Sequence, residues 1–201
     1  MKAAISNPWT FITLCLVLPV TAYAAMEWYN VFYEKPAVYG VVEQTCLRKF
    51  TNQHNTPAES ISDGKLTVVN FFFTSCPVIC PKMMGNMKRI HDLFPDRSDI
   101  RFVSISVDPE HDTRERLQWY IHKMHINDKN WQILRGNKSD IYTVARNQFN
   151  LVAADANENS DFIHSDKLIL VDGSGKIRGY YSGLEKSAMD QLIIDIKKLT
   201  S

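Results

Sequence analysis

The sequence feature that most constrains the fold is an almost unbroken apolar run from Leu66 to Phe73, LTVVNFFF, which leads directly into two cysteines. The run is rich in β-branched and aromatic residues, which is typical of a central strand covered on both faces of its sheet. From Pro81 to Phe94 the apolar residues then follow helical spacing. The sequence therefore predicts a buried strand, a cysteine-containing turn and a helix in direct succession.

The rest of the chain continues this alternation of strands and helices. A second buried strand is predicted from Ile100 to Val107, and a helix is predicted to begin at Asp112, where Asp112 and Glu115 resemble a capping box. Further along, the pattern predicts a short helix at 141–149, two strands joined by a hairpin turn at 167–171 and 176–181, and a last helix at 189–199. This order is typical of an α/β, thioredoxin-like fold, with a central mixed sheet flanked by helices.

The first residues resemble an export signal. Lys2 supplies a short basic region, an apolar stretch runs from Trp9 to Val20, and Ala22-Tyr23-Ala24 has the small-x-small cleavage pattern. The alternative is an uncleaved anchor, because residues 9–28 can be counted as an apolar span of about 20 residues, roughly what a bilayer requires. Both interpretations place the domain outside the cytoplasmic membrane, on its periplasmic face.

Length and charge set the domain plan. With 201 residues, of which 45% are hydrophobic, the chain can bury one sizeable core and is short for two. We expect a signal peptide or anchor over residues 1–24, a tether over 25–45 and one thioredoxin-like domain over 46–201. The 23 basic and 22 acidic residues are scattered without runs, so no nucleic-acid surface is predicted. Membrane contact is expected only through the N-terminal segment.

Cys76 and Cys80 stand where the first strand passes into its helix, which is where α/β folds place ligand and redox chemistry. Residues four apart share one helical face, so both sulfurs are expected on an exposed rim. Backbone N–H groups and the helix dipole would favour the thiolate form there. Two thiolates and an imidazole suit Cu(I) and also accept Cu(II). The spacing alone leaves a copper site, a zinc site and a disulfide open.

Three segments of the chain resemble the SCO/SenC family of copper-binding proteins. They occur in the family's order and spacing, and the likeness runs from about Lys49 to Leu199. Three motifs in order are far more specific than one cysteine pattern. The segments are FFFTSCPVICPKM at 71–83, VSISVDPEHDT at 103–113 and DFIHSDKLILVDGSGKI at 161–177.

The resemblance implies a copper metallochaperone that delivers copper to the binuclear copper centre of cytochrome c oxidase. Its copper ligands would be Cys76, Cys80 and His164, its partner would be the copper-bearing oxidase subunit, and no residue would be catalytic. Two alternatives stay open. One is a copper or redox sensor. The other is a thiol–disulfide oxidoreductase that cycles Cys76 and Cys80 through a redox-active disulfide to keep the recipient's cysteines reduced. A second thiol–disulfide oxidoreductase is a candidate partner.

One feature argues against thiol exchange as the sole role. Thiol oxidoreductases of similar fold place a cis-proline loop opposite their cysteines, whereas this chain has no proline after Pro109. The corresponding place, ahead of the strand at 167–171, holds Ile163 and His164. An imidazole would therefore face the cysteines where a redox enzyme docks its substrate.

Two positions depart from the family pattern, which commonly has an acid between the cysteines and another directly before the histidine. Here these positions hold Val78 and Ile163, and Asp161 is the candidate substitute for the second acid. Asp108, in the segment after the second strand, is expected to support the ligands or face a partner, with a structural turn role as the alternative. These departures concern copper affinity and docking, since all three donor atoms are present.

The remaining cysteines, histidines and methionines receive structural interpretations. Cys15 is expected to be an apolar filler and Cys46 a buried free thiol. His122 and His125 could clamp a metal, but an exposed helix face is favoured. The other expectations are surface positions for His54, His91 and His111, and core positions for Met83, Met84 and Met87.

Overall fold

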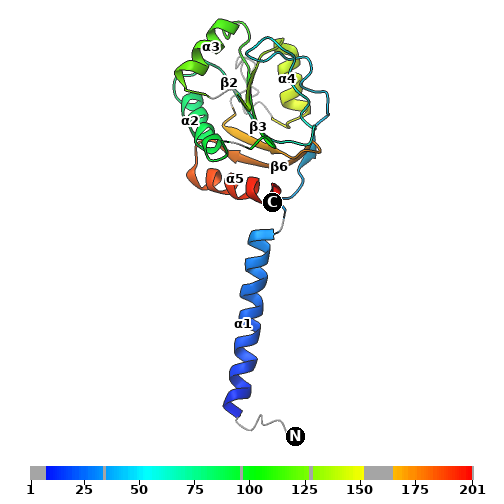
Figure 1. Cartoon of the computed structure of the whole chain (residues 1–201), viewed down its shortest axis with the longest axis vertical. Coiled ribbons are helices and arrows are strands. Elements are labelled where there is room, and N and C mark those ends of the chain that lie inside the picture. Colours follow the sequence, from blue (N-terminus) through cyan, green and yellow to red (C-terminus); the bar gives the residue numbers. More distant parts are fainter. Residues whose placement is uncertain (1–7, 34, 96, 127–128, 152–164, 201) are drawn as a thin grey trace, which may run out of the picture. The chain divides into compact units, whose positions relative to one another are not determined.

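A computed structural model describes residues 8–33, 35–95, 97–126, 129–151 and 165–200 of the chain (Figure 1). The chain divides into two compact units, residues 1–35 and residues 36–201. Each unit is described by itself. The first is essentially one helix, and the second carries the sheet and the remaining helices.

The first unit contains α1, Pro8–Tyr33, a helix of 26 residues. Between Pro8 and Tyr29 it is long and apolar enough to cross a membrane, a property that signal sequences near an N-terminus share. The helix continues well into the segment for which the sequence predicts a tether. No glycine or proline interrupts residues 20–33, so nothing in the local sequence ends the helix before that point.

The second unit is built on a six-stranded mixed sheet with the order β1-β6-β5-β2-β3-β4. Strand β2 pairs in parallel with β3 and β3 with β4, whereas β5, β6 and β1 add antiparallel pairs. The strand bounds are Gly40–Val41 for β1, Leu66–Phe72 for β2, Ile100–Ser106 for β3, Trp131–Leu134 for β4, Lys167–Val171 for β5 and Lys176–Ser182 for β6. The predicted central mixed sheet is therefore confirmed, with β1 and β4 as strands that the sequence analysis did not foresee.

Helices cover both faces of this sheet. Their bounds are Ile79–Asp92 for α2, Arg114–Lys123 for α3, Lys138–Asn147 for α4 and Lys186–Leu199 for α5. Along β2, Val68 and Phe72 belong to the buried cluster that includes residues of α2, α3 and α5. The alternate residues Val69 and Phe71 belong to a second cluster, which includes residues of α4. Figure 1 shows α4 on the other side of the sheet from α2 and α5. Burial on both faces explains the unbroken apolar run of β2.

The hairpin between β5 and β6 is organised by Asp172. Its carboxylate accepts hydrogen bonds from the backbone N–H of Ser174 at 2.9 Å, from that of Lys176 at 3.0 Å, and from Arg178 Nε at 2.7 Å. Burial alone would raise the pKa of Asp172, but the hydrogen bond from Ser174 Oγ at 2.7 Å and the three bonds above outweigh it and hold the pKa below its usual value. Gly175 adopts a φ of +83° in this turn, a conformation that favours glycine. The predicted hairpin is confirmed.

The predicted start of α3 is wrong. The N-cap is Thr113, whose side chain accepts a hydrogen bond from the backbone N–H of Arg116, and the helix begins at Arg114. Asp112 instead turns into the protein and is fully buried. A threonine directly after an aspartate can take over the cap, which frees the carboxylate for a tertiary contact.

Candidate metal centre

The cysteine turn follows β2 directly and leads into α2. Cys76 precedes the helix, whose N-cap is Val78, and Cys80 lies in its first turn. The backbone N–H of Cys80 donates to Cys76 Sγ at 3.3 Å, which joins the two residues across the turn. Cys76 and Cys80 are only 8% and 5% exposed, so the prediction that both sulfurs lie on an exposed rim is wrong. The outer side of the turn is formed instead by Val78 and Ile79, which are 68% and 42% exposed.

The two thiols have opposite electrostatic environments. Burial alone would raise the pKa of Cys76, but hydrogen bonds from Cys80 and from the backbone of Val78 and Ile79 hold that pKa below its usual value. Burial raises the pKa of Cys80 to about 12, and Cys76 and the negative charge of Asp112 add to the rise. The expected preference for the thiolate therefore holds for Cys76 and fails for Cys80.

The four cysteines of the chain are free thiols in this structure, so Cys76 and Cys80 are in the dithiol form. Cys46 is buried, as predicted, and burial together with the charge of Glu43 raises its pKa to about 12. Cys46 packs in the cluster on the α4 face of the sheet, whereas Cys76 and Cys80 belong to the cluster on the opposite face. The position of Cys46 is therefore consistent with its predicted role as a buried structural thiol.

Asp112 fixes the turn that carries the cysteines. Its carboxylate accepts hydrogen bonds from Thr74 Oγ1 at 2.5 Å, from the backbone N–H of Thr74 at 3.2 Å and from Ser106 Oγ at 2.5 Å. Thr74 lies two residues before Cys76, and Ser106 ends β3, so one buried carboxylate holds the cysteine turn against the neighbouring strand. The sequence analysis missed this role because it assigned Asp112 to a helix cap.

Asp108 lies close by in the chain but makes different contacts. It is 5% exposed, and its carboxylate accepts from His111 Nδ1 at 2.9 Å. This hydrogen bond and the negative charge of Asp108 raise the pKa of the exposed His111. The backbone N–H of Asp108 donates to Ser106 Oγ at 3.3 Å. These contacts suit the turn role, while a role behind the metal ligands stays a prediction.

The third predicted ligand, His164, lies outside the described residues, as do Asp161 and Ile163. The segment that follows it returns beside the cysteines. Ser165 and Asp166 line a largely apolar cavity of about 280 Å³ together with Phe71, Phe73, Cys76, Ile79, Cys80 and Leu184. Within the described parts of the chain, no cluster of three or more His, Cys, Asp or Glu side chains could hold a metal ion. A three-ligand site at the cysteines therefore requires a donor from beyond those parts, and His164 directly precedes the cavity-lining Ser165.

The other candidate side chains separate clearly by burial. His91 was expected at the surface, but it is 2% exposed, bonds Asn130 Oδ1 at 2.6 Å and packs against Phe102 and Trp131. His122 and His125 are exposed, and their ring centroids lie 6.5 Å apart. The methionines Met83, Met84 and Met87 are fully buried, as predicted.

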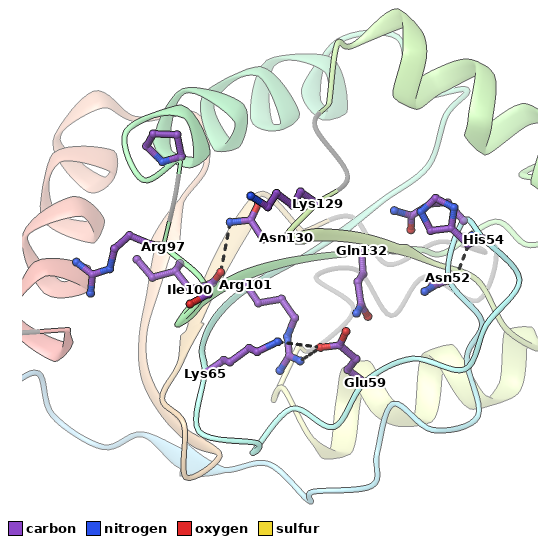
Figure 2. A pocket seen from close by; sticks show the side chains of 13 residues that line it. Asn52, His54, Glu59, Lys65, Arg97, Ile100, Arg101, Lys129, Asn130 and Gln132 are labelled. Atoms are coloured by element: carbon purple, nitrogen blue, oxygen red, sulfur yellow. Dashed lines mark hydrogen bonds and ion pairs between the residues drawn. The ribbon is translucent and has the colours of Figure 1, made fainter.

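A larger cavity of about 410 Å³ lies at the opposite edge of the sheet, where the parallel strands begin (Figure 2). Two of its basic side chains, Arg101 and Lys65, are paired with carboxylates. Arg101 bonds Glu59 Oε2 at 2.8 Å and Asp63 Oδ2 at 3.0 Å, and Lys65 lies 3.3 Å from Glu59 Oε2. Figure 2 shows Lys65, Arg101 and Glu59 meeting on one side of the cavity, away from His54 and Asn52. None of the described residues that line this cavity carries a sulfur atom, so the cavity is separate from the cysteine site.

The fold and the cysteine site define a thioredoxin-like protein with a dithiol at the carboxyl end of a central strand. The family model SCO1/SenC matches residues 48–201, and the chain therefore belongs to the SCO1/SenC family. The chain is 31% identical over 156 residues to the SCO1 protein homolog of Bacillus subtilis. The matched region covers 76% of this chain and 80% of the Bacillus protein.

Solved structures agree with this family. The chain resembles BsSco, described as a member of the Sco family of cytochrome c oxidase assembly proteins with a disulfide switch. That match has a TM-score of 0.68 and 29% identity, and it covers 83% of this chain and 96% of the other. Arabidopsis thaliana ScoI, solved with copper bound, matches with a TM-score of 0.61 and 25% identity over 81% of this chain and 99% of the other.

Proposed function

We propose that this chain is a copper metallochaperone that holds copper between Cys76, Cys80 and His164 and delivers it to the binuclear copper centre of cytochrome c oxidase. The observation that carries the proposal is the buried dithiol beside the segment that directly follows His164. Membership of the SCO1/SenC family supports it, since relatives include a structure with bound copper and an oxidase assembly protein. The recipient would be the copper-bearing subunit of the oxidase.

The donor set suits this cargo. Thiolate sulfur is a soft ligand that selects Cu(I), and an imidazole completes a low-coordinate set that also accepts Cu(II). Hydrogen bonds lower the pKa of Cys76, which favours its thiolate, whereas Cys80 must release a proton when it becomes a ligand. Transfer then consists of exchanging these ligands for those of the recipient, with no turnover of a small molecule.

A second candidate function is thiol–disulfide exchange, and the unequal thiols favour it. The Cys76 thiolate would attack a disulfide of the recipient and form a mixed disulfide. Cys80, after losing its proton, would then attack the Cys76 sulfur, releasing the recipient as a dithiol and leaving a Cys76–Cys80 disulfide. A thiol–disulfide oxidoreductase partner would reduce this disulfide again. A copper or redox sensor would use the same residues without transferring copper.

The N-terminal segment supports a location outside the cytoplasmic membrane, on the periplasmic face. Helix α1 has the length and apolar composition of a membrane anchor or a signal sequence. The membrane would be contacted only through this segment. Asp108 and Asp161 would support the ligands or face the recipient.

The imidazole separates the two functions because both need the cysteines and only copper transfer needs His164. The full chain, reduced and purified in detergent, should bind one Cu(I), and His164→Ala should weaken binding strongly. The matched control is His122→Ala, which removes an exposed imidazole and should leave binding unchanged. In cells at limiting copper, His164→Ala and Cys80→Ser should both abolish oxidase assembly. Normal assembly with His164→Ala, together with failure of Cys80→Ser, would establish thiol exchange as the function instead.

A further inference from the structure

Two polar side chains, Arg101 and Gln132, occupy buried positions on neighbouring strands. Every residue of β3 and β4 is buried, and Arg101 and Gln132 are only 3% and 9% exposed. Phe102 pairs with Trp131 across these strands, and both rings belong to the buried cluster that includes residues of α2. Successive residues of a strand point to opposite faces of the sheet. Arg101 and Gln132 therefore lie together on the other face, where both line the cavity of about 410 Å³ (Figure 2).

Arg101 is fully accounted for by contacts within the fold. Its Nη1 donates to Glu59 Oε2 at 2.8 Å and to Asp63 Oδ2 at 3.0 Å, and its Nη2 donates to the backbone O of Ser60 at 2.7 Å. These partners all belong to the segment that leads into β2. The guanidinium therefore fastens that segment to the beginning of β3 and forms one wall of the cavity.

Gln132 differs, because its side-chain amide has no hydrogen-bond partner within the parts of the chain that the structure describes. Figure 2 shows this side chain pointing from β4 into the cavity. The nearby amide of Gln53 is engaged at both ends, since it donates to the backbone O of Trp131 at 3.0 Å and accepts from the backbone N–H of Ile133 at 2.8 Å. A buried amide without partners destabilises a fold. Here it faces a cavity with the volume of a ligand site.

The wall of this cavity is predominantly basic. Glu59 Oε2 contacts both Arg101 and Lys65, so the one negative charge in the lining is already compensated. The ammonium group of Lys65 has three N–H donors, and the side chain is 39% exposed. Positive charge in a partly enclosed space attracts anions. The charged side chains of the lining are Lys65, Arg97, Arg101, Lys129 and Glu59.

We propose that this cavity binds a small organic oxyanion, a carboxylate or a phosphate ester, through the amide of Gln132 and the ammonium group of Lys65. Hydrogen bonds to a charged oxygen are stronger than those between neutral groups, so an oxyanion satisfies the Gln132 amide well. Pro95 and Ile100 add apolar surface for the carbon part of such a molecule. The site lies at the opposite edge of the sheet from the cysteines and does not depend on the proposed function.

The test is thermal unfolding of the full metal-free chain in detergent, followed by circular dichroism, with citrate, inorganic phosphate or chloride at equal ionic strength. Citrate represents carboxylates, and inorganic phosphate represents phosphate esters. Gln132→Met keeps the length of the side chain and removes the amide, and Lys65→Met removes a charge from the lining. The matched control is Lys49→Met, because Lys49 is also paired with a carboxylate, that of Asp140 at 2.8 Å, and does not line the cavity.

The Tm of the wild type should rise with citrate, with phosphate or with both, and not with chloride, because a ligand that binds only the folded state stabilises it. The Kd obtained from this dependence should increase about tenfold or more in Gln132→Met. It should increase about two- to fivefold in Lys65→Met and stay unchanged in Lys49→Met. Without an anion, the Tm of Gln132→Met should not fall, since the amide has no protein partner to lose.

A response to citrate alone would identify the ligand as a carboxylate, and a response to phosphate alone would identify it as a phosphate ester. Equal rises in the wild type and in Gln132→Met would overturn the inference, because a general salt effect does not depend on this side chain. A wild type that responds to neither anion, or a lower anion-free Tm of Gln132→Met, would overturn it as well. Cu(I) binding by Gln132→Met should equal that of the wild type, so a failure of the proposed function would be recognised separately.

Discussion

Replacing Asp112 with alanine should destabilise the domain by at least about 3 kcal/mol. The carboxylate is fully buried and accepts hydrogen bonds from three groups: the backbone N–H of Thr74, Thr74 Oγ1 and Ser106 Oγ. Each buried donor left without an acceptor costs about 1 to 3 kcal/mol, so three such donors give about 3 kcal/mol even at the low end of this range. This loss is a large fraction of the roughly 5 to 15 kcal/mol by which natural domains are stable.

The assay is chemical unfolding of the full chain in mild detergent, followed by the fluorescence of the buried Trp131. Asp112→Asn keeps one acceptor oxygen and should lose about 1 to 2 kcal/mol, less than the alanine variant. Asp140→Asn is the control, because Asp140 is paired with Lys49 at the surface and its loss should not measurably change the unfolding midpoint. An unfolding midpoint of Asp112→Ala equal to that of Asp140→Asn would refute the idea that this carboxylate holds the cysteine turn.

Three further predictions concern reactivity, pH and location. In the reduced, metal-free chain, iodoacetamide should modify Cys76 before Cys80 and Cys46. The reason is that hydrogen bonds lower the pKa of Cys76 while burial raises the pKa of the other two thiols. Equal modification rates in the native state, measured by mass spectrometry, would contradict this difference in pKa. Asp172→Asn should be less stable than the wild type at pH 7, and the difference should disappear as the pH falls below about 4. The reason is that a carboxyl whose folded-state pKa is lowered by hydrogen bonds stabilises the fold only above that pKa. A stability difference that persists at low pH in unfolding experiments would exclude this origin. A reporter that is active only outside the cytoplasm should give signal when it is fused after Gly40. The same fusion without residues 1–33 should give no signal. Activity without those residues would rule out export by this segment.

The sequence by itself determined the central strands and the main helices. In β2, apolar side chains are needed on both faces, so an unbroken run such as LTVVNFFF has few other structures available to it. The apolar spacing of Met83, Met84, Met87 and Ile90 likewise fixed the inner face of α2, because a 3.6-residue period is a local property of the helix. The cysteine pair and its position between strand and helix were also evident without any structure.

Only the tertiary structure decided which polar groups turn inward. Asp112 and Thr113 could each cap α3, and the choice depended on the hydrogen bonds that Thr74 and Ser106 donate to Asp112. Thr74 is distant from Asp112 in the sequence, and the parallel pairing of β2 and β3 brings it close to Ser106 and Asp112. His91 is a core residue because Asn130 forms a hydrogen bond with its ring and because Phe102 of β3 and Trp131 of β4 pack against it.

The environment of the cysteines was decided in the same way. Their spacing along the chain was known, but the packing of α2 and α3 against the sheet determined that both sulfurs are buried and that burial raises the pKa of Cys80. Burial and hydrogen bonding depend on groups supplied by several separate segments, and a local sequence pattern contains no information about which of those groups will be adjacent in space.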